Sequence, residues 1–374
     1  MNKIIIAPRE TGKSTFLLAK IKSILNENKP IAILDSATDH KSKSLIYKFL
    51  ELNQDFHLIK PNLTKDIIIP SSVNDYYTAC IQSDLFKNMV KHKNKTICID
   101  LSYFLEKGHY FSDINDKTSA RYYRNMYNLL SQQTAVCLMA LTKLDYLPSI
   151  TVFGDEIEFP ICEIDISTFQ DANTQFICGI HKENAFGTFY KGFKHLKLNT
   201  EHIDIVKDKD TLCGSACINY ILKQDKPDAR ISRNEVWCSN IAETLLGYGY
   251  NIELRCFNSR LYQDALTNTD DFDGFKSIQN YLQYNNIYQV APTIDVLNEE
   301  ILCNRYCIYN VSSQVFNKDS TMIGGHYIIA STVVDGLVQI INPRQIDYKI
   351  QYITLEELQS CIKDFGSWRI IIKK

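Results

Sequence analysis

Short runs of apolar residues alternate with segments of helical periodicity in the first half of the chain. The apolar runs cover residues 3–7, 30–35, 95–100 and 134–141, and the helical patterns lie at 14–25 and 118–133. Runs that are apolar at nearly every position are typical of strands buried on both faces. Their alternation with helices predicts an α/β domain with a mainly parallel sheet. Two later runs, 161–166 and 174–180, are interpreted as an antiparallel tail of the same sheet.

In the second half, helical patterns come first and strands follow. The helices are expected at 213–222 and 233–246, and the strands at 251–256, 306–311, 326–333, 338–341 and 368–372. Helices followed by consecutive strands predict an α+β domain with an antiparallel sheet. The polar stretch at 196–210 is the best boundary, so we expect domains at 1–198 and 199–374.

The length of 374 residues suits two domains. With 41 basic and 43 acidic residues the net charge is −2, which argues against nucleic acid as a partner, although a local basic patch remains compatible with it. No apolar run has the length of a membrane span, and the apolar start is too short for a secretion signal. Twelve cysteines without paired CxxC spacing indicate free thiols in a reducing compartment and no zinc site, so we expect a cytoplasmic protein.

Residues 7–14 fit the phosphate-loop pattern GxxxxGK[ST], except that Ala7 replaces the first glycine. An apolar run precedes the loop and a helical pattern follows it, as the motif requires. Backbone amides at such a helix start surround phosphate oxygens. The motif predicts bound ATP with Mg²⁺: Lys13 reaches the outer phosphates, and Ser14 and Asp100 hold the metal. The nucleotide-binding residues expected in this way are Thr11, Gly12, Lys13, Ser14, Thr15 and Asp100.

These features of residues 1–195 resemble RecA-like ATPases, whose nucleotide sites are often completed at subunit interfaces, so the resemblance admits a homo-oligomer. His181 and Lys182, after a late apolar run, match the segment where such proteins carry a basic residue near the phosphates. A rival reading uses residues 142–145, Thr-Lys-Leu-Asp, which are similar to the guanine-reading [NT]KxD motif of GTPases. Because the segment after Asp100 lacks the GTPase switch glycine, ATP is preferred over GTP.

A second group of residues suits thiol chemistry. Cys213 begins a helical pattern, where the helix dipole stabilises a thiolate. Gly214 leaves room for a substrate backbone, and nearby amides can face an oxyanion. His326 begins an apolar run, and Asn342 ends the next run 16 residues later, so an antiparallel pair of strands would bring them together. Asn342 would then hold the imidazole in the tautomer that accepts the thiol proton.

This order of cysteine, histidine and asparagine resembles the papain-like superfamily, above all the bacteriocin-leader peptidases, over about residues 200–374. The resemblance implies that Cys213 is the nucleophile, His326 the general base and Asn342 its orienting partner. Those peptidases carry an oxyanion glutamine six residues before the cysteine, where this chain has Lys207. The oxyanion donor is therefore unassigned, and Cys217 is interpreted as a core thiol.

The predicted function is a cysteine hydrolase, most simply a peptidase acting on a peptide or protein, coupled to or regulated by ATP in the first domain. Two alternatives stay open. One is a nucleotide-switched module that binds a peptide or protein through an inactive peptidase-like domain. The other is a thiol-dependent acyltransferase, in which the acyl group passes from Cys213 to an amine. A third possibility, a RecA-like motor acting on nucleic acid, receives little support from the nearly neutral charge balance.

Overall fold

The structure is a computed structural model. It describes residues 2–7, 12–36, 44–51, 55–61, 73–155, 172–180, 193–198, 212–231, 237–267, 272–313, 325–342, 350–363 and 366–374. The chain divides into two compact units, Met1–Leu198 (unit 1) and Asn199–Lys374 (unit 2). The side chains of residues 73–75 are not part of the description.

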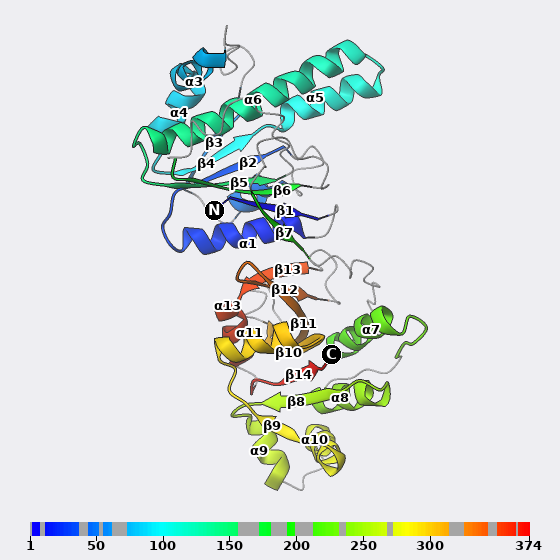
Figure 1. The fold of residues 1–374 in the computed structure, drawn as a ribbon. Coiled ribbons are helices and arrows are strands. Elements are labelled where there is room, and N and C mark those ends of the chain that lie inside the picture. The colour runs from blue at the N-terminus through cyan, green and yellow to red at the C-terminus, as the bar shows by residue number, and fades with distance from the viewer. Residues whose placement is uncertain are drawn as a thin grey trace. The chain divides into compact units, whose positions relative to one another are not determined.

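Unit 1 contains a seven-stranded sheet in the order β3-β4-β2-β5-β6-β1-β7, and every neighbouring pair is parallel (Figure 1). The strands are β1 (Lys3–Ile6), β2 (Ile31–Asp35), β3 (Phe56–Ile59), β4 (Thr96–Asp100), β5 (Ile150–Asp155), β6 (Thr174–Ile180) and β7 (Lys194–Lys197). The helices are α1 (Lys13–Leu25), α2 (Leu45–Leu50), α3 (Val73–Gln82), α4 (Asp84–Lys91), α5 (Ser102–Asp113) and α6 (Lys117–Lys143). The predicted α/β domain with a parallel sheet is therefore confirmed.

Two sequence predictions for unit 1 need correction. Residues 134–141 are not a strand but part of α6, whose segment from Leu130 to Thr142 is buried on nearly all sides by the sheet and by α3 and α4. Burial on all sides removes the apolar periodicity that distinguishes a helix from a strand. Residues 174–180 do form a strand, β6, but it is parallel and lies inside the sheet. The run at 161–166 lies outside the described residues.

Unit 2 contains a seven-stranded sheet in the order β13-β12-β11-β10-β14-β8-β9. Its strands are β8 (Ile252–Cys256), β9 (Ile287–Gln289), β10 (Tyr306–Ser312), β11 (Gly325–Val334), β12 (Leu337–Ile341), β13 (Ile350–Thr354) and β14 (Arg369–Ile372). Its helices are α7 (Cys213–Asp225), α8 (Cys238–Gly247), α9 (Arg260–Thr267), α10 (Asp273–Tyr284), α11 (Ile294–Cys303) and α13 (Leu355–Lys363). The sheet is mixed rather than antiparallel, because β9 adds to β8 in parallel while the other described pairs are antiparallel.

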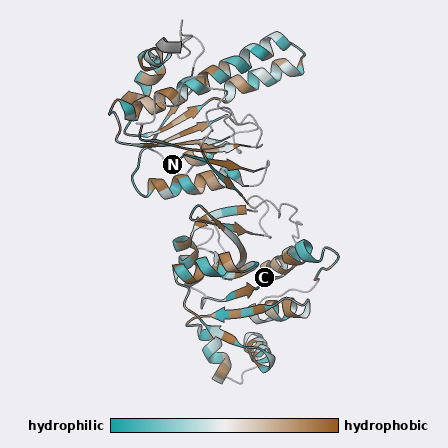
Figure 2. Cartoon of the chain, in the orientation of Figure 1, coloured by the Kyte–Doolittle hydropathy of each residue, from teal (hydrophilic) through white to brown (hydrophobic). Residues whose placement is uncertain are grey.

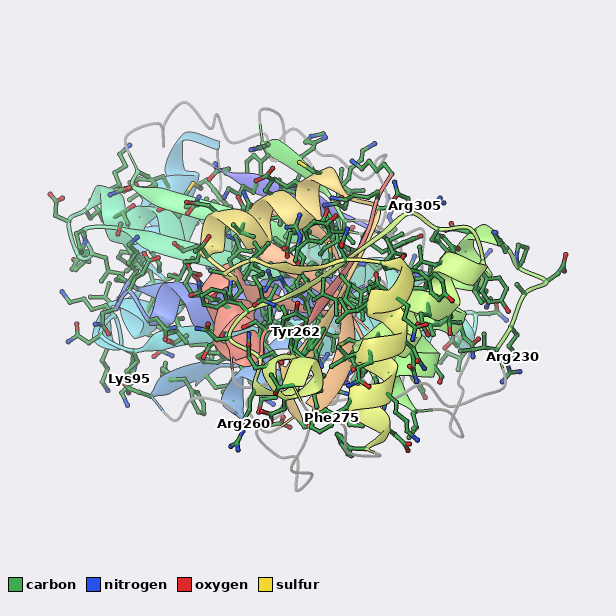
Figure 3. All side chains as sticks on the ribbon, turned by 90° about the horizontal axis from the view of Figure 1, so that it is seen from below. Lys95, Arg230, Arg260, Tyr262, Phe275 and Arg305 are labelled. Atoms are coloured by element: carbon green, nitrogen blue, oxygen red, sulfur yellow. The ribbon has the colours of Figure 1, made fainter. Side chains whose placement is uncertain are left out.

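Apolar residues concentrate on the strands of both sheets (Figure 2). In unit 2 one cluster lies between the sheet and α7, α8 and α10, and another lies between the sheet, α11 and α13. Tyr262 on α9 and Phe275 on α10 pack at the margin of the first cluster (Figure 3). None of the helices in the described ranges combines the length and apolar character that crossing a bilayer requires.

Candidate functional site

The predicted phosphate loop connects the end of β1 to the start of α1. Gly12 adopts a φ of 91°, a left-handed conformation that glycine tolerates, and its carbonyl accepts the first helical bond from Phe16 N at 2.9 Å. Thr15 is half-buried in the first turn of α1. Thr11 falls in the segment 8–11, outside the described residues. The backbone amides at the start of α1 therefore lie at the carboxyl edge of the sheet.

Lys13 is buried, and its ammonium donates a 3.0 Å hydrogen bond to the carbonyl oxygen of Ala7. A buried ammonium requires acceptors of this kind to offset the loss of water. The side chain thus folds back over the start of the loop, where phosphate oxygens could replace the carbonyl as its acceptors.

Ser14 is joined to an acid that the sequence analysis did not select. Its Oγ donates a 2.5 Å hydrogen bond to Oδ2 of Asp155, the buried last residue of β5. Strand β6 lies between β1 and β5, and Gly179 of β6 pairs in register with Asp155. A Cβ on Gly179 would lie 3.3 Å from both Asp155 Oδ1 and Leu17 Cδ1. The glycine therefore provides the space in which Asp155 reaches across β6.

Asp100 is not at this site, which corrects the sequence prediction. It ends β4, and three strands separate β4 from β1, or about 19 Å at the usual spacing of about 4.8 Å. Its Oδ1 accepts hydrogen bonds from the Ser102 amide (3.1 Å) and hydroxyl (2.7 Å), and its Oδ2 forms an ion pair with Lys60 at 3.6 Å.

Three apolar strands end in aspartate at the same level of the sheet. Asp35 of β2 pairs in register with Asp100 on one side and with Asp155 on the other. The carboxylate of Asp35 is used structurally, because it accepts a bond from Ser44 Oγ at 2.5 Å. Among the described strands of unit 1, three therefore end in aspartate, and the strand order decides which aspartate faces Ser14.

The Thr-Lys-Leu-Asp segment lies at the wrong edge of the sheet for reading a base. Thr142 and Lys143 end α6, and Asp145 occupies a left-handed turn with a φ of 57° just before β5 begins. This is the amino edge, whereas Ser14 and Asp155 lie at the carboxyl edge. His181 and Lys182 lie outside the described residues.

In unit 2, Cys213 is the first residue of α7, and α7 packs against β11. Gly214 is buried in the first turn of α7. The N-cap residue, Leu212, makes no side-chain hydrogen bond to the backbone amides of that turn. Cys213 is half-buried against the cluster that contains Tyr327, the residue after His326. The helix start and the histidine strand are thus packed together.

His326 and Asn342 meet as the sequence predicted. The hairpin of β11 and β12 turns at Asp335 and Gly336, both with positive φ. It places His326 Nε2 3.1 Å from Oδ1 of the buried Asn342. Because this amide oxygen only accepts, the imidazole donates through Nε2 and carries its lone pair on Nδ1 when neutral.

The thiol itself is not bonded to the imidazole. Within the described part of the chain, no hydrogen bond joins Cys213 Sγ to His326. Nearby, Cys238 Sγ lies 3.2 Å from the Tyr327 hydroxyl, and burial raises the pKa of Cys238 to about 12. Burial also raises the pKa of Cys217 well above that of a free thiol. Both core thiols are therefore protonated at neutral pH. Lys207, at the position of the oxyanion glutamine of the bacteriocin-leader peptidases, lies outside the described residues.

No protein-family model matches the chain, and no curated protein matches it. One solved structure that it matches is that of the genome packaging NTPase from Sulfolobus turreted icosahedral virus 2 in complex with ATP-γS. The two are 11% identical, the match covers 54% of this chain and 79% of that chain, and the TM-score is 0.28. At this score the likeness does not define the fold or the activity of the chain.

Proposed function

We propose that unit 1 is a P-loop nucleoside triphosphatase that binds ATP and Mg²⁺ at the carboxyl edge of its sheet. The observation that supports this most directly is the bond between Ser14 and Asp155. It joins the hydroxyl of Ser14, at the start of α1, to a carboxylate on β5, two strands away from β1 in the sheet. Gly12 precedes α1 in a left-handed conformation. Neither the turn nor the acid alone would favour a nucleotide site as strongly as the two together.

The residues present fit the implied cofactor. A serine hydroxyl and an aspartate carboxylate are the oxygen donors that Mg²⁺ prefers, and Gly179 leaves space beside Asp155. The ion would neutralise phosphate charge there. Lys13 would exchange the Ala7 carbonyl for phosphate oxygens, and the amides at the start of α1 would hold the anion.

This proposal is tested by titrating the full chain with a fluorescent ATP analogue and Mg²⁺, together with an assay of phosphate release. Lys13→Ala should weaken binding by about tenfold or more, because a buried charge-assisted contact is lost. Lys22→Ala, on the exposed part of the same helix, should bind normally. Absence of binding by the wild type, or equal binding by the two variants, would contradict the proposal. Competition with unlabelled GTP measures the base preference.

As a second function, we infer that unit 2 is a cysteine hydrolase, most simply a peptidase, and that nucleotide in unit 1 regulates it. The bond between His326 and Asn342 supports this, because an imidazole that donates through Nε2 would keep Nδ1 as a base on β11, the strand that packs against α7. His326 would take the thiol proton as Cys213 sulfur attacks a peptide carbonyl carbon. The C–N bond then breaks, the amine leaves with that proton, and water hydrolyses the Cys213 thioester.

A peptide library incubated with the wild type, with and without ATP and Mg²⁺, tests this function. Cys213→Ala should abolish cleavage, while Cys303→Ala, which removes an exposed thiol elsewhere, should not. If Lys13→Ala leaves cleavage intact at all nucleotide levels, the two units are not coupled. Peptide binding without turnover would favour the nucleotide-switched binding module. Transfer of the acyl group to an added amine would favour the acyltransferase.

A further inference from the structure

Helix α5 and the first half of α6 form a helical arm, defined here as residues 102–128. Helix α5 begins directly after β4, at the carboxyl edge, and α6 returns to the amino edge before β5. With 27 residues α6 is about 40 Å long, whereas the six residues of β5 span about 20 Å. Burial along α6 becomes continuous only from Leu130 onward. The arm therefore projects beyond the edge that carries Ser14 and Asp155 (Figure 1).

One side of the arm carries a row of exposed tyrosines. Tyr103, Lys107 and Tyr110 follow at spacings of four and three residues, so they share one face of α5. Ile114, the C-cap residue of α5, follows Tyr110 by four residues. Tyr103, Tyr110 and Ile114 are 48%, 56% and 55% exposed. The ammonium of Lys107 lies 5.8 Å from the Tyr103 ring and 5.9 Å from the Tyr110 ring. This face presents two aromatic rings about 10 Å apart with a cation between them.

Other residues of the arm pack α5 against α6. Gly108 of α5 faces α6, and a Cβ there would lie 3.2 Å from Arg124 Cγ, so the two helices approach closely. Phe111 stacks on Tyr123 of α6 with ring centroids 5.4 Å apart. Because the packing between the helices uses other residues, the exposed tyrosines are not needed to close the hairpin.

The arm carries four cationic side chains against three acids, and three of the cations lie together on α6. Lys107, Lys117, Arg121 and Arg124 form no ion pair within the described part of the chain. Arg121 and Lys117 share one exposed stripe of α6, because they are four residues apart. The acids of the arm are Glu106, Asp113 and Asp116, and Asp116 is used to cap α6 through the Ser119 amide at 3.1 Å.

We propose that the arm binds single-stranded nucleic acid. Exposed tyrosines stack on unpaired bases whatever their sequence, and cations spaced along the same helices contact phosphates. An unpaired strand offers the base faces on which these tyrosines would stack, whereas a duplex keeps its bases paired inside the helix. The net charge of the whole chain argued against nucleic acid as a partner. This inference revises that expectation, because Lys117, Arg121 and Arg124 are grouped on α6. It stands independently of the proposed nucleotide and cysteine chemistry.

The test is fluorescence anisotropy of the full chain with a labelled oligonucleotide of about 20 nucleotides, single-stranded or duplex, over a range of salt. The double variant Tyr103→Ala/Tyr110→Ala should bind the single strand at least about tenfold more weakly, because two stacking contacts are lost. The triple variant Lys117→Gln/Arg121→Gln/Arg124→Gln should lower the salt slope by about two. Tyr284→Ala, which removes an 86% exposed tyrosine of unit 2, is the matched control and should bind normally.

Two results would overturn the proposal. One is no binding of the single strand at low salt, or binding that all variants retain. The other is a change in oligomeric state on Tyr103→Ala/Tyr110→Ala, measured by sedimentation, with oligonucleotide affinity unchanged. That second result would assign the tyrosine face to contacts between copies of the chain. Circular dichroism of each variant establishes that the arm is still folded.

Discussion

The hydroxyl of Ser14 donates a 2.5 Å hydrogen bond to the carboxylate of Asp155, although 141 positions separate the two residues in the sequence. The bond crosses β6, because the strand order places β6 between β1 and β5. Asp155 of β5 therefore reaches Ser14 by passing over a residue of β6, and that residue must leave space for its side chain. Gly179 satisfies that condition.

The first prediction separates the two candidate acids by a matched pair of substitutions. Asp155→Asn should lower the rate of ATP hydrolysis by at least about a hundredfold, because the carboxylate beside Ser14 is lost. Asp100→Asn should leave the rate within about twofold, since its carboxylate contacts Ser102 and Lys60 instead. Phosphate release at saturating ATP and Mg²⁺ measures both. Loss of activity only in Asp100→Asn would return the role to the acid expected from sequence.

The second prediction concerns the space above Gly179. Gly179→Ala adds a Cβ 3.3 Å from Asp155 Oδ1 and from Leu17 Cδ1, so one of them must move. We expect a loss of stability of about 1–3 kcal/mol and weaker nucleotide binding. Gly247→Ala is the control, because its Cβ would meet nothing within 4 Å. Urea unfolding and nucleotide titration of both variants measure the effect, and similar behaviour of the two would remove Gly179 from the site.

Elements that depend on neighbouring residues were predicted well from the sequence, whereas features that depend on contacts between distant residues were predicted poorly. The strands around Ile4 and Ile33, the helix starts at Lys13 and Cys213, and the hairpin joining His326 to Asn342 depend on neighbouring residues. The helical nature of residues 134–141 depends on what covers them, because a segment buried on all sides has lost its amphipathic pattern. The choice among three aspartates depends on strand order, which short patterns do not encode.

The third prediction tests whether Asn342 orients His326. If His326 Nδ1 accepts the Cys213 proton during reaction, alkylation of Cys213 should be faster than that of Cys303 and should depend on the histidine. Asn342→Ala removes the acceptor of the Nε2 proton and should slow Cys213 alkylation about tenfold or more. Cys303 in the same sample is the internal control, because it is exposed at the end of α11. Rates for both thiols follow from mass spectrometry of iodoacetamide-treated protein across neutral pH.

One outcome would contradict the prediction for Asn342. If Cys213 reacts like Cys303 and Asn342→Ala changes neither rate, the bond between His326 and Asn342 is a structural bond of the hairpin. Asn342→Asp serves as the conservative variant, because a carboxylate still accepts the Nε2 proton and should restore the rate.

The fourth prediction concerns acid stability of unit 1. The rings of His57 and His92 stack with centroids 3.5 Å apart. Burial, with the charges of His92, Lys95 and Lys91, lowers the pKa of His57 below its ordinary value of about 6.5. The unfolded chain then binds this proton more readily than the folded chain, so stability is present above about pH 6.5 and is lost as the pH falls below it.

Amide hydrogen exchange in β3 and α4 measures this effect against pH. In the wild type, protection should decrease as the pH falls below about 6.5, and His57→Gln should flatten that dependence. His109→Gln, on exposed α5, should behave as the wild type. An unchanged pH dependence in His57→Gln would show that another group is responsible.

The last prediction concerns a buried charge cluster in unit 2. The fully buried Arg369 donates from Nε to Glu300 Oε1 at 3.1 Å, and Arg255 Nη1 donates to the same oxygen at 2.8 Å. The hydroxyl of Tyr309 donates to Glu300 Oε2 at 3.1 Å. Arg369→Met removes one of the two arginines that pair with Glu300, together with the donors to the carbonyls of Ser367 and Val290, so it should cost about 3–5 kcal/mol. Arg260→Met, at a residue whose side chain is 94% exposed, should cost little (Figure 3).

Tryptophan fluorescence during urea unfolding isolates this effect, because both tryptophans of the chain, Trp237 and Trp368, belong to unit 2. Trp368 precedes Arg369 and donates from Nε1 to Ser259 Oγ at 2.9 Å, so it reports on the strand that carries the cluster. A double variant, Arg369→Met with Glu300→Gln, should lose less than the sum of the single changes, since it removes the attraction only once. Strictly additive losses would mean that Glu300 is neutralised chiefly by Arg255.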